Sequence, residues 1–329
     1  MAWASLWDAQ AARRVISQAP LIAVSDLDPT SGRYTPAADF YIRNHNHIPG
    51  PRATTALRLE GEVEKPQRVT PDALTRYQRH SLGAVLECAG NPVSAAGLVG
   101  NGLWDGWRLA DVLALANPKK SGVHLQVFGR DGYARSVPVE RAGEALLVTS
   151  LNGQPLTKEG GAPWRILFPG WYGMDSVKWV DRIVVTSWPL PPRGNDYLER
   201  KRTGTGEAEV RPLPRLHVKS VIAAPLDGGR VRRGLVKIRG LAWSGGGTIA
   251  QVEVSADGGK QWGEAGLKAG SRYEWVSWEA EIEMNQPGSL ELVCRATDST
   301  GQTQPAEREA ARADDYGNNG YHRVRCTVV

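Results

Sequence analysis

The pattern of hydrophobic and polar positions divides the chain into two parts that meet near residue 205. In the first part, short strand patterns are mixed with helical ones. The segment 107–116, WRLADVLALA, has apolar residues at helical spacing and ends before Asn117 and Pro118, which predicts a helix. The segment 123–139, VHLQVFGRDGYARSVPV, predicts two strands joined by a glycine-containing turn.

Two further segments of the first part end strands in loops. The segment 165–187, RILFPGWYGMDSVKWVDRIVVTS, predicts a strand, a loop rich in Pro and Gly, and a second strand. The segment 83–91, GAVLECAGN, predicts a buried strand followed by a tight turn, so Cys88 lies where the strand becomes a loop. A thiol there is a nucleophile, a metal ligand or, as for most free cysteines, a small buried hydrophobe.

In the second part the helical pattern fades and short strand patterns recur at regular spacing. They include VIAAP, LVKIRGLAW, IAQVEVSADGG, WVSWEAEIEM, SLELVCRATD and HRVRCTVV, separated by turns such as DGG, SGGG and QPGS. Such spacing predicts an antiparallel β-sandwich. The Pro- and Gly-rich WPLPPRGNDY and the polar LERKRTGTGEAEVRP mark the boundary. We therefore expect an α+β chain, with a mixed α/β domain over residues 1–205 and a β-sandwich over residues 206–329.

Composition narrows the possible functions. The 329 residues are 23% charged and 41% hydrophobic, as in globular proteins, with a net charge of +5. No Lys/Arg-rich block with interleaved aromatic residues occurs, so we do not expect nucleic-acid binding. No apolar run approaches the roughly 18 residues that a membrane-spanning helix needs.

The three cysteines lack CxxC spacing, which excludes a disulfide scaffold and a cysteine-based zinc site. The chain also lacks the CxxCH motif of covalently attached haem. Cys294 and Cys326 lie within strand patterns of the sandwich, where packing thiols are favoured over a disulfide. A bond between them remains geometrically possible if their strands are neighbours.

Arg13 and Arg14 suggest a twin-arginine export signal, but the following VISQAPLIAVSD is too short and interrupted for its hydrophobic region. We therefore expect a plain N-terminal helix. The protein is either cytoplasmic or has had a signal removed.

Groups suited to bind a ligand are concentrated in four segments of the first part. DFYIRNHNHIPG ends an apolar strand with Arg43, Asn44, His45 and His47; the other segments supply Cys88, Arg165 with Lys178, and Tyr197. Arg, Lys and backbone N–H groups in loops favour an anionic ligand. Each residue alone also fits a plain structural role, such as a solvated cation, a histidine bonded to a carbonyl or a packed tyrosine.

Taken together and in this order, FYIRNHNHIP, LECAGN, PGWYGMDSVKW and NDY resemble the molybdenum-cofactor enzymes of the sulfite oxidase family. In the second part, LAWSGGG, VSADGGKQW, VSWE and HRVRC resemble the immunoglobulin-like dimerisation domain of that family. The resemblance extends from about residue 35 to residue 329. It implies an enzyme that binds a molybdenum-molybdopterin cofactor.

The resemblance also implies roles for individual residues. Cys88 matches the cysteine that gives its thiolate to molybdenum, a soft donor that suits this metal. The residues that match positions holding the pterin and its phosphate are His45, Asp131, Arg165, Ser176 and Lys178. Arg43 and Tyr197 match substrate-pocket residues, and Arg272 looks like the arginine that the second domain extends towards that pocket. An anion such as sulfite is held by this positive lining and oxidised to sulfate.

The chain departs from the family pattern at three positions. Pro92 and Val93 follow CAGN where sulfite oxidases commonly have two arginines, and Gly160 stands where the family often has a histidine. The residues that match cofactor-binding positions are therefore mostly present, while those that match sulfite-binding positions include one cation fewer. The expected substrate is sulfite or a less charged sulfur compound.

The resemblance implies partners as well. No haem-binding or flavin-binding segment is found in the sequence, so electrons pass to an external acceptor, for which a c-type cytochrome is the natural candidate. The sandwich implies a homodimer. Export of such enzymes favours a periplasmic location after signal removal, with the cytoplasm as the alternative. Two other functions remain open: a sulfoxide-type reductase with the same cofactor, and a binding protein that kept the fold without the cofactor.

Overall fold

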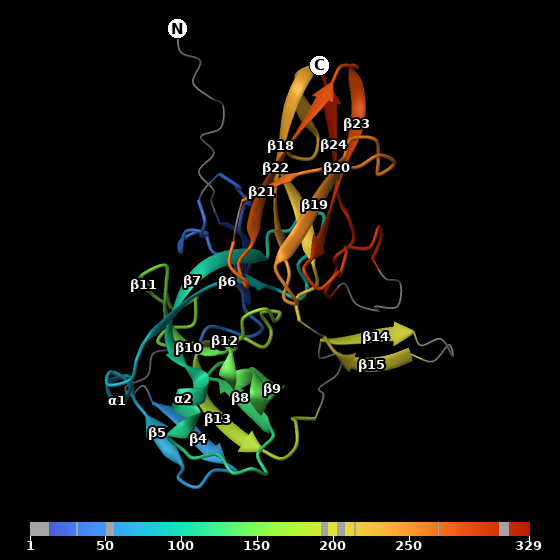
Figure 1. Ribbon diagram of the computed structural model, residues 1–329. Coiled ribbons are helices and arrows are strands. Elements are labelled where there is room, and N and C mark those ends of the chain that lie inside the picture. Colours follow the sequence, from blue (N-terminus) through green and yellow to red (C-terminus); the bar gives the residue numbers. More distant parts are fainter. Residues whose placement is uncertain are drawn as a thin grey trace.

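The computed structural model describes residues 13–30, 32–50, 56–191, 197–202, 208–213, 215–268, 270–308 and 316–329 of the chain. Two regions lie one above the other (Figure 1). The lower region combines several sheets with short helices, and the upper region is a β-sandwich that contains the C-terminus. The predicted fold class is confirmed, although the first region contains more sheet and less helix than its sequence pattern predicts.

The first of two five-stranded sheets in the lower region has the order β5-β4-β13-β8-β9. Its strands are Gln67–Val69, Leu57–Gly61, Val180–Thr186, His124–Gly129 and Ala134–Pro138. β13 is parallel to β4 and antiparallel to β8. The predicted strands around the glycine-containing turn are confirmed as the pair β8 and β9. Those around the Pro/Gly-rich loop are confirmed as Arg165–Leu167 and Val180–Thr186, which belong to different sheets.

The second five-stranded sheet has the order β11-β10-β7-β6, and β12 pairs with β10. Its strands are Gln154–Pro155, Leu146–Leu151, Val99–Arg108, His80–Glu87 and Arg165–Leu167. β6 ends at Glu87, so Cys88 lies directly after the strand, as the sequence predicts. β6 and β7 lie in the part of the lower region that faces the sandwich (Figure 1).

The helices are short. They are α1, Pro71–Leu74, α2, Leu109–Ala114, and the 3-10 helix η1, Val139–Gly143. α2 confirms the predicted helix within narrower bounds, and its apolar face is buried through Leu109, Val112 and Leu113. Thr70 caps α1 by accepting a hydrogen bond from the N–H of Ala73.

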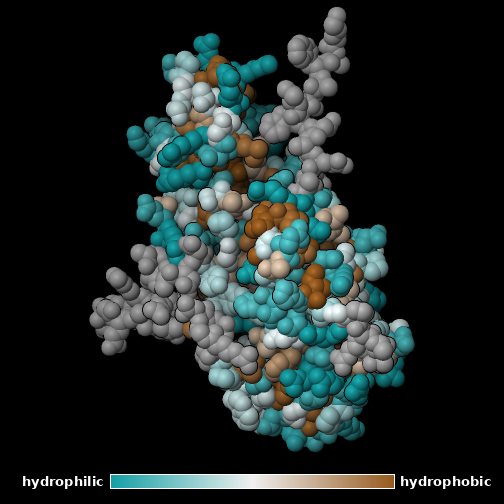
Figure 2. Space-filling view, turned by 180° about the vertical axis from the view of Figure 1, so that it is seen from behind, coloured by the Kyte–Doolittle hydropathy of each residue, from teal (hydrophilic) through white to brown (hydrophobic). Residues whose placement is uncertain are grey.

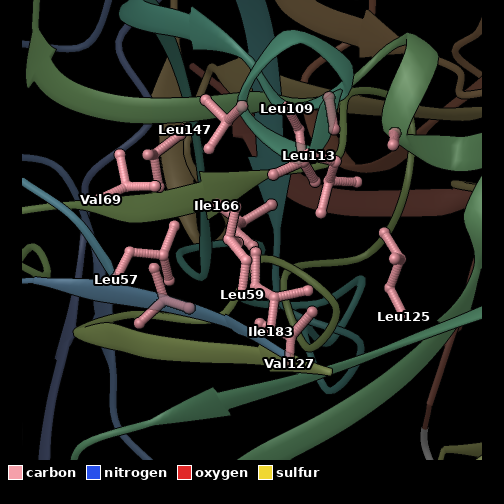
Figure 3. Packing of buried hydrophobic residues seen from close by; sticks show 14 of the residues in the cluster. Leu57, Leu59, Val69, Leu109, Leu113, Leu125, Val127, Leu147, Ile166 and Ile183 are labelled. Carbon is pink, nitrogen blue, oxygen red and sulfur yellow. The ribbon is translucent and has the colours of Figure 1, made fainter. Parts of the chain in front are cut away.

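The hydrophobic core of the lower region lies between its two large sheets and α2 (Figure 3). Alternate residues of a strand share one face, so Leu57 and Leu59 of β4 enter the core together with Ile183 of β13. Leu109 and Leu113 of α2 cover them from the other side. Each such buried side chain stabilises the fold by about 1.5–3 kcal/mol.

The segment at the start of the described chain forms a small sheet instead of the expected helix. Strands β1, Arg14–Gln18, β2, Leu21–Val24, and β3, Ile42–Arg43, pair in that order. β-branched Val15 and Ile16 favour a strand, and Pro20 lies in the turn between β1 and β2. The helix prediction was wrong because strand propensity and this turn outweighed a weak helical pattern. The small sheet positions Arg43.

The sandwich consists of a four-stranded sheet, β16-β18-β22-β21, and a five-stranded sheet, β17-β24-β23-β19-β20. The strands of the first are Lys219–Ala224, Gly234–Trp243, Val276–Met284 and Gly266–Lys268. The strands of the second are Gly229–Val231, His322–Val328, Gly288–Asp298, Ile249–Ser255 and Gly263–Glu264. The six predicted strand segments are confirmed.

The two cysteines of the sandwich are separate packing thiols. Cys294 is opposite His322 in the β23–β24 register, and Cys326 is opposite Leu290. Both are free and buried in the core between the sheets. The expectation of packing thiols is confirmed.

A two-stranded hairpin, β14, Leu198–Arg202, and β15, Ala208–Pro212, extends from the junction of the two regions (Figure 1). The predicted domain boundary near residue 205 falls between these strands and lies outside the described residues. Seen from behind, hydrophobic residues gather in patches near the middle of the molecule, among a mostly hydrophilic surface (Figure 2). Among the described helices, none has the length and apolar character needed to cross a membrane.

Candidate active site

A cavity in the lower region brings together side chains from segments that are far apart in the sequence. All but one of the predicted site residues line it: Arg43, His45, Cys88, Asp131, Arg165, Ser176, Lys178 and Tyr197. Aromatic and aliphatic side chains such as Phe40, Tyr41 and Trp104 form the rest of its wall. A mostly apolar wall with a few convergent polar groups is typical of a ligand site.

Cys88 is fixed by the turn that follows β6. Its N–H donates to the carbonyl of Leu98 at 2.9 Å, and its own carbonyl accepts from the N–H of Asn91 at 3.0 Å. The side-chain oxygen of Asn91 accepts from the N–H of Leu98 at 2.9 Å. Burial raises the pKa of the Cys88 thiol, while the nearby Arg43 acts in the opposite direction. The thiol thus sits in a rigid loop, beside a cation that favours its thiolate form.

Asn44 connects two of the cations of the site. The side chain of Lys178 donates to Oδ1 of Asn44 and, at 3.1 Å, to the carbonyl of Glu159. The guanidinium of Arg43 donates to the carbonyl of Asn44. Asn44 is buried, and its Nδ2 has no hydrogen-bond partner among the described residues. A buried donor of this kind is suited to an acceptor supplied by a ligand or a water.

Arg165 is buried among carbonyl groups. It donates to the carbonyl of Gly160 at 3.3 Å and to that of Ser176 at 3.0 Å, and its Nε has no partner among the described residues. Burial lowers the pKa of Arg165 to about 10. Burial, followed by the charge of Arg165, brings the pKa of Lys178 well below its usual range.

Within the described chain, no carboxylate forms an ion pair with Arg165 or with Lys178. Burial lowers the pKa values of both cations, and the carboxylates of Asp131 and Glu159 oppose the shift of Lys178 without cancelling it. A bound anion would supply the missing charge. This part of the cavity is therefore chemically suited to a phosphate or another oxyanion.

His45 and Asp131 also line the cavity, and the charge of Lys178 acts on the Asp131 carboxylate. The Asp131 carboxylate accepts from the N–H of Tyr133 at 3.2 Å, and burial raises its pKa. The rings of His45 and Tyr133 lie 5.3 Å apart between centroids, and the Tyr133 hydroxyl donates to the carbonyl of Met174 at 3.0 Å. These groups offer hydrogen-bond donors and acceptors for the polar edge of a ring-shaped ligand.

Tyr197 follows the second large break in the described chain and has a left-handed backbone, with φ of +54°. Its ring lies 4.9 Å from that of Tyr316, which belongs to the upper region, and the guanidinium of Arg135 lies 5.2 Å from its centroid. Burial raises the pKa of the Tyr197 hydroxyl, which keeps it protonated as a hydrogen-bond donor.

Arg272 is the predicted site residue that does not line this cavity. Its side chain is 57% exposed and lies 3.8 Å from the carboxylate of Glu144. The turn that carries Arg272 is held by Glu274, which accepts hydrogen bonds from the N–H of Ser271 and from Arg33. The expectation that Arg272 extends into the pocket is therefore corrected: Arg272 contacts Glu144 outside the cavity.

The sequence did not indicate the roles of two residues at the site, one of which lines the cavity. Arg13 lines the cavity and lies 3.5 Å from the carbonyl of Phe40, to which it donates. Tyr316 packs on Tyr197 without lining the cavity. The Arg13-Arg14 pair was visible, but its link to the cavity depends on the pairing of the small N-terminal sheet with β3, which lies far along the chain. Pro92 is exposed and Val93 is buried, and both lie outside the cavity lining.

Comparison with known families agrees with this geometry. Residues 45–192 match the model of the oxidoreductase molybdopterin binding domain, and residues 211–329 match that of the Mo-co oxidoreductase dimerisation domain. The fold and the site thus define a molybdopterin-type oxidoreductase domain joined to a dimerisation domain. The chain belongs to the sulfite oxidase family, as its relatives show.

The sulfite oxidase of Gallus gallus is 32% identical over 333 residues, which cover 89% of this chain and 72% of that protein. The mitochondrial sulfite oxidase of Mus musculus is 31% identical over 97% of this chain and 66% of its own length. The chain thus spans somewhat less than two thirds of the mouse protein. The structure of the sulfane dehydrogenase SoxCD from Paracoccus pantotrophus has a TM-score of 0.86 at 28% identity, covering 98% of this chain and 92% of that chain.

Proposed function

We propose that this protein oxidises a sulfur compound at a molybdenum-molybdopterin cofactor that is held in the cavity, with Cys88 as the protein ligand of the metal. The observation that carries the proposal is the pairing of a rigid, half-buried thiol with cations that form no ion pair within the described chain. A pure scaffold gains nothing from burying Arg165 and placing the half-buried Lys178 near it.

The residues present fit this cofactor. A pterin phosphate needs cationic and N–H donors, and the Arg165 Nε and Asn44 Nδ2 are buried donors without partners among the described residues. Lys178 adds a positive charge at the same place. Cys88 supplies a single sulfur, a donor that suits a metal already carrying the dithiolene sulfurs of its cofactor. His45, Asp131 and Ser176 complete the set proposed to hold the pterin.

When bound, the cofactor supplies oxygen-atom transfer to sulfur and accepts the two electrons that are released. The chain itself holds and orients the substrate. We assign Arg43 to an oxygen of the anionic substrate, because it lines the cavity beside Cys88 and forms no ion pair within the described chain. The Tyr197 hydroxyl donates a hydrogen bond to the substrate, and the packing of Tyr316 on its ring keeps that hydroxyl in place.

The identity of the sulfur compound follows from the charge of the pocket. Pro92 and Val93 give no cation, and Arg272 contacts Glu144 elsewhere, so Arg43 is the cation nearest to Cys88 in this assignment. Losing a charge-assisted hydrogen bond costs on the order of 1.5–3 kcal/mol. Sulfite is the first candidate. A sulfane compound is the second, favoured by the likeness to a sulfane dehydrogenase.

The partners are part of the same proposal. Electrons pass to a separate acceptor, for which we propose a c-type cytochrome. The dimerisation domain supports a homodimer, in which residues 206–329 form the interface domain and residues 1–205 the catalytic one. Light scattering at micromolar concentration is expected to give about twice the chain mass; a monomer would count against this arrangement.

The test is an assay of protein produced in a host that makes molybdopterin. We expect about one molybdenum per chain and steady turnover with an artificial electron acceptor, since binding is coupled to a pre-formed site. Sulfite and thiosulfate are compared as substrates in parallel. Turnover with thiosulfate alone rejects sulfite and keeps the cofactor; metal-free protein from such a host rejects the proposal as a whole.

A further inference from the structure

Strand β6 separates two buried environments. Successive side chains of a strand point to opposite faces. Leu86 and Cys88 therefore line the cavity, while Val85 and Glu87 face the other way. Val85 packs in a hydrophobic cluster with Leu241 and Trp243 of the sandwich. The sandwich thus lies against the back of the strand that presents the cavity thiol.

Glu87 is the residue directly before Cys88 and is fully buried. Its Oε1 accepts from Nζ of Lys219 at 2.5 Å and from Nδ2 of Asn91 at 3.0 Å. Its Oε2 accepts from Nε1 of Trp243 at 2.8 Å. Lys219 and Trp243 belong to β16 and β18 of the sandwich, and neither is exposed by more than 1%. One carboxylate therefore connects the two regions through two donors of the sandwich, while a third donor, Asn91, comes from its own region.

The backbone on both sides of the thiol is held as well. The carbonyl of Glu87 accepts from the N–H of Gly173 at 2.6 Å, and the carbonyl of Ala89 accepts from the N–H of Gly317 at 2.7 Å. Gly173 lines the cavity, and Gly317 comes from the upper region. The residues before and after Cys88 are thus each bonded to a different part of the molecule.

We propose that Glu87 is a positioning residue that fixes Cys88 for its metal through Lys219 and Trp243, so that the sandwich, beyond its part in dimerisation, sets the geometry of the active site. The inference rests on the proposed role of Cys88 as metal ligand. A buried carboxylate with three donors can adopt few orientations. Because Cys88 is the next residue, its position is restricted as well. Groups that orient a metal ligand are a part of the site in their own right.

The test uses Glu87→Gln in the full-length protein. Glutamine keeps the shape but has a single oxygen, so its NH₂ group faces either Trp243 or the Lys219–Asn91 pair, which are all donors. The matched control is Glu274→Gln. Glu274 also joins the two regions, through Arg33 at 2.5 and 2.8 Å, but does not contact the Cys88 loop by any hydrogen bond in the described chain.

In the metal-loaded protein we expect Glu87→Gln to lower kcat by about 10- to 100-fold, as for other groups that orient a metal ligand. KM should stay within about twofold, because no substrate contact is removed. The molybdenum X-ray absorption spectrum should show an altered distance to the cysteine sulfur. Glu274→Gln should leave all three quantities at their wild-type values.

In cofactor-free protein the thiol itself is the probe. Cys294 and Cys326 are buried, so iodoacetamide under native conditions reacts first at Cys88. Glu87→Gln should speed this reaction by about tenfold, since the loop is released, and Glu274→Gln should not. The alkylation rate tests the positioning role even if the wild-type protein takes up no molybdenum. Absence of molybdenum would reject the proposed function and not the positioning role.

If Glu87→Gln does not fold, Trp243→Phe replaces it, because phenylalanine keeps an aromatic ring and removes the Nε1 donor to Glu87 together with a part of the ring volume. We expect kcat, the sulfur distance and the alkylation rate to change in the same directions as in Glu87→Gln, but by smaller amounts. The inference is overturned if the folded variant, Glu87→Gln or Trp243→Phe, matches Glu274→Gln in alkylation rate, sulfur distance and kcat.

Discussion

A lysine lies on each side of β6, and the two lysines differ in whether a carboxylate pairs with them. On the sandwich side, Lys219 pairs with the Glu87 carboxylate at 2.5 Å. On the cavity side, the half-buried Lys178 donates to the amide oxygen of Asn44 and to a backbone carbonyl, and it forms no ion pair within the described chain. The pKa of Lys178 is accordingly brought well below its usual range, first by burial and then by Arg165.

This difference separates a structural cation from a ligand-binding one. A buried cation whose charge is already matched contributes to the fold, and its removal leaves a buried carboxylate alone. A buried cation without a matching anion weakens the empty fold and becomes favourable only when a ligand supplies the charge. The comparison therefore predicts opposite effects for equivalent substitutions on the two sides of one strand.

The largest effect is expected at the thiol between them. Cys88→Ser removes the proposed sulfur ligand while changing the side-chain volume little, so turnover should fall below detection. The thermal midpoint of the cofactor-free protein should stay close to that of wild type, because the half-buried side chain makes few packing contacts. Turnover close to wild type in this variant would exclude Cys88 as the metal ligand.

On the sandwich side, Lys219→Met leaves Glu87 buried without its cation. We expect a loss of about 3–5 kcal/mol in the free energy of unfolding, measured by urea denaturation of the cofactor-free protein. Lys237→Met is the control, since Lys237 is exposed and pairs at the surface with Glu279 and Glu281. Equal stability of the two variants would mean that the buried pair does not hold the regions together.

On the cavity side, Lys178→Met should have the opposite effect on the empty protein. Removing an unmatched buried charge raises the thermal midpoint of the cofactor-free form. The same change weakens cofactor retention by about tenfold or more, since a charge-assisted hydrogen bond contributes about 1.5–3 kcal/mol. Molybdenum content after dialysis measures the second effect. If the cofactor-free variant is less stable than wild type, Lys178 has a structural role instead.

The smallest effect is a pH dependence of the empty protein. Because the pKa of Lys178 is lowered in the folded state, the unfolded chain binds more protons between that pKa and about 10.4. Stability should therefore rise with pH in this window. Below the window, the cost of holding the charged Lys178 side chain in the folded protein should be fully present. The difference in unfolding free energy between wild type and Lys178→Met should shrink as the pH rises; a constant difference would contradict a lowered pKa.

Much of the site could be predicted from the sequence because its motifs are local. Cys88 follows a strand whose apolar run and small-residue turn are both visible in GAVLECAGN, and Arg165 and Lys178 flank one readable loop. The strands of the sandwich were equally visible, since each carries its own period-two pattern.

The rest depends on contacts between distant segments. Glu87 gave no sign of its role, because Lys219 and Trp243 reach it only through the packing of the sandwich on β6. Arg13 enters the cavity only because a small sheet forms where a helix was expected. Arg272 was misplaced for the same reason, as its turn is fixed by the contact between Glu274 and Arg33.

The central claim is that Cys88 ligates the molybdenum of a bound molybdopterin, and X-ray absorption at the molybdenum edge tests it most directly. Wild-type protein from a molybdopterin-producing host should contain about one molybdenum per chain, with a cysteine sulfur ligand that is missing in Cys88→Ser. Identical sulfur coordination in the two proteins, or wild-type protein without molybdenum, would contradict the account.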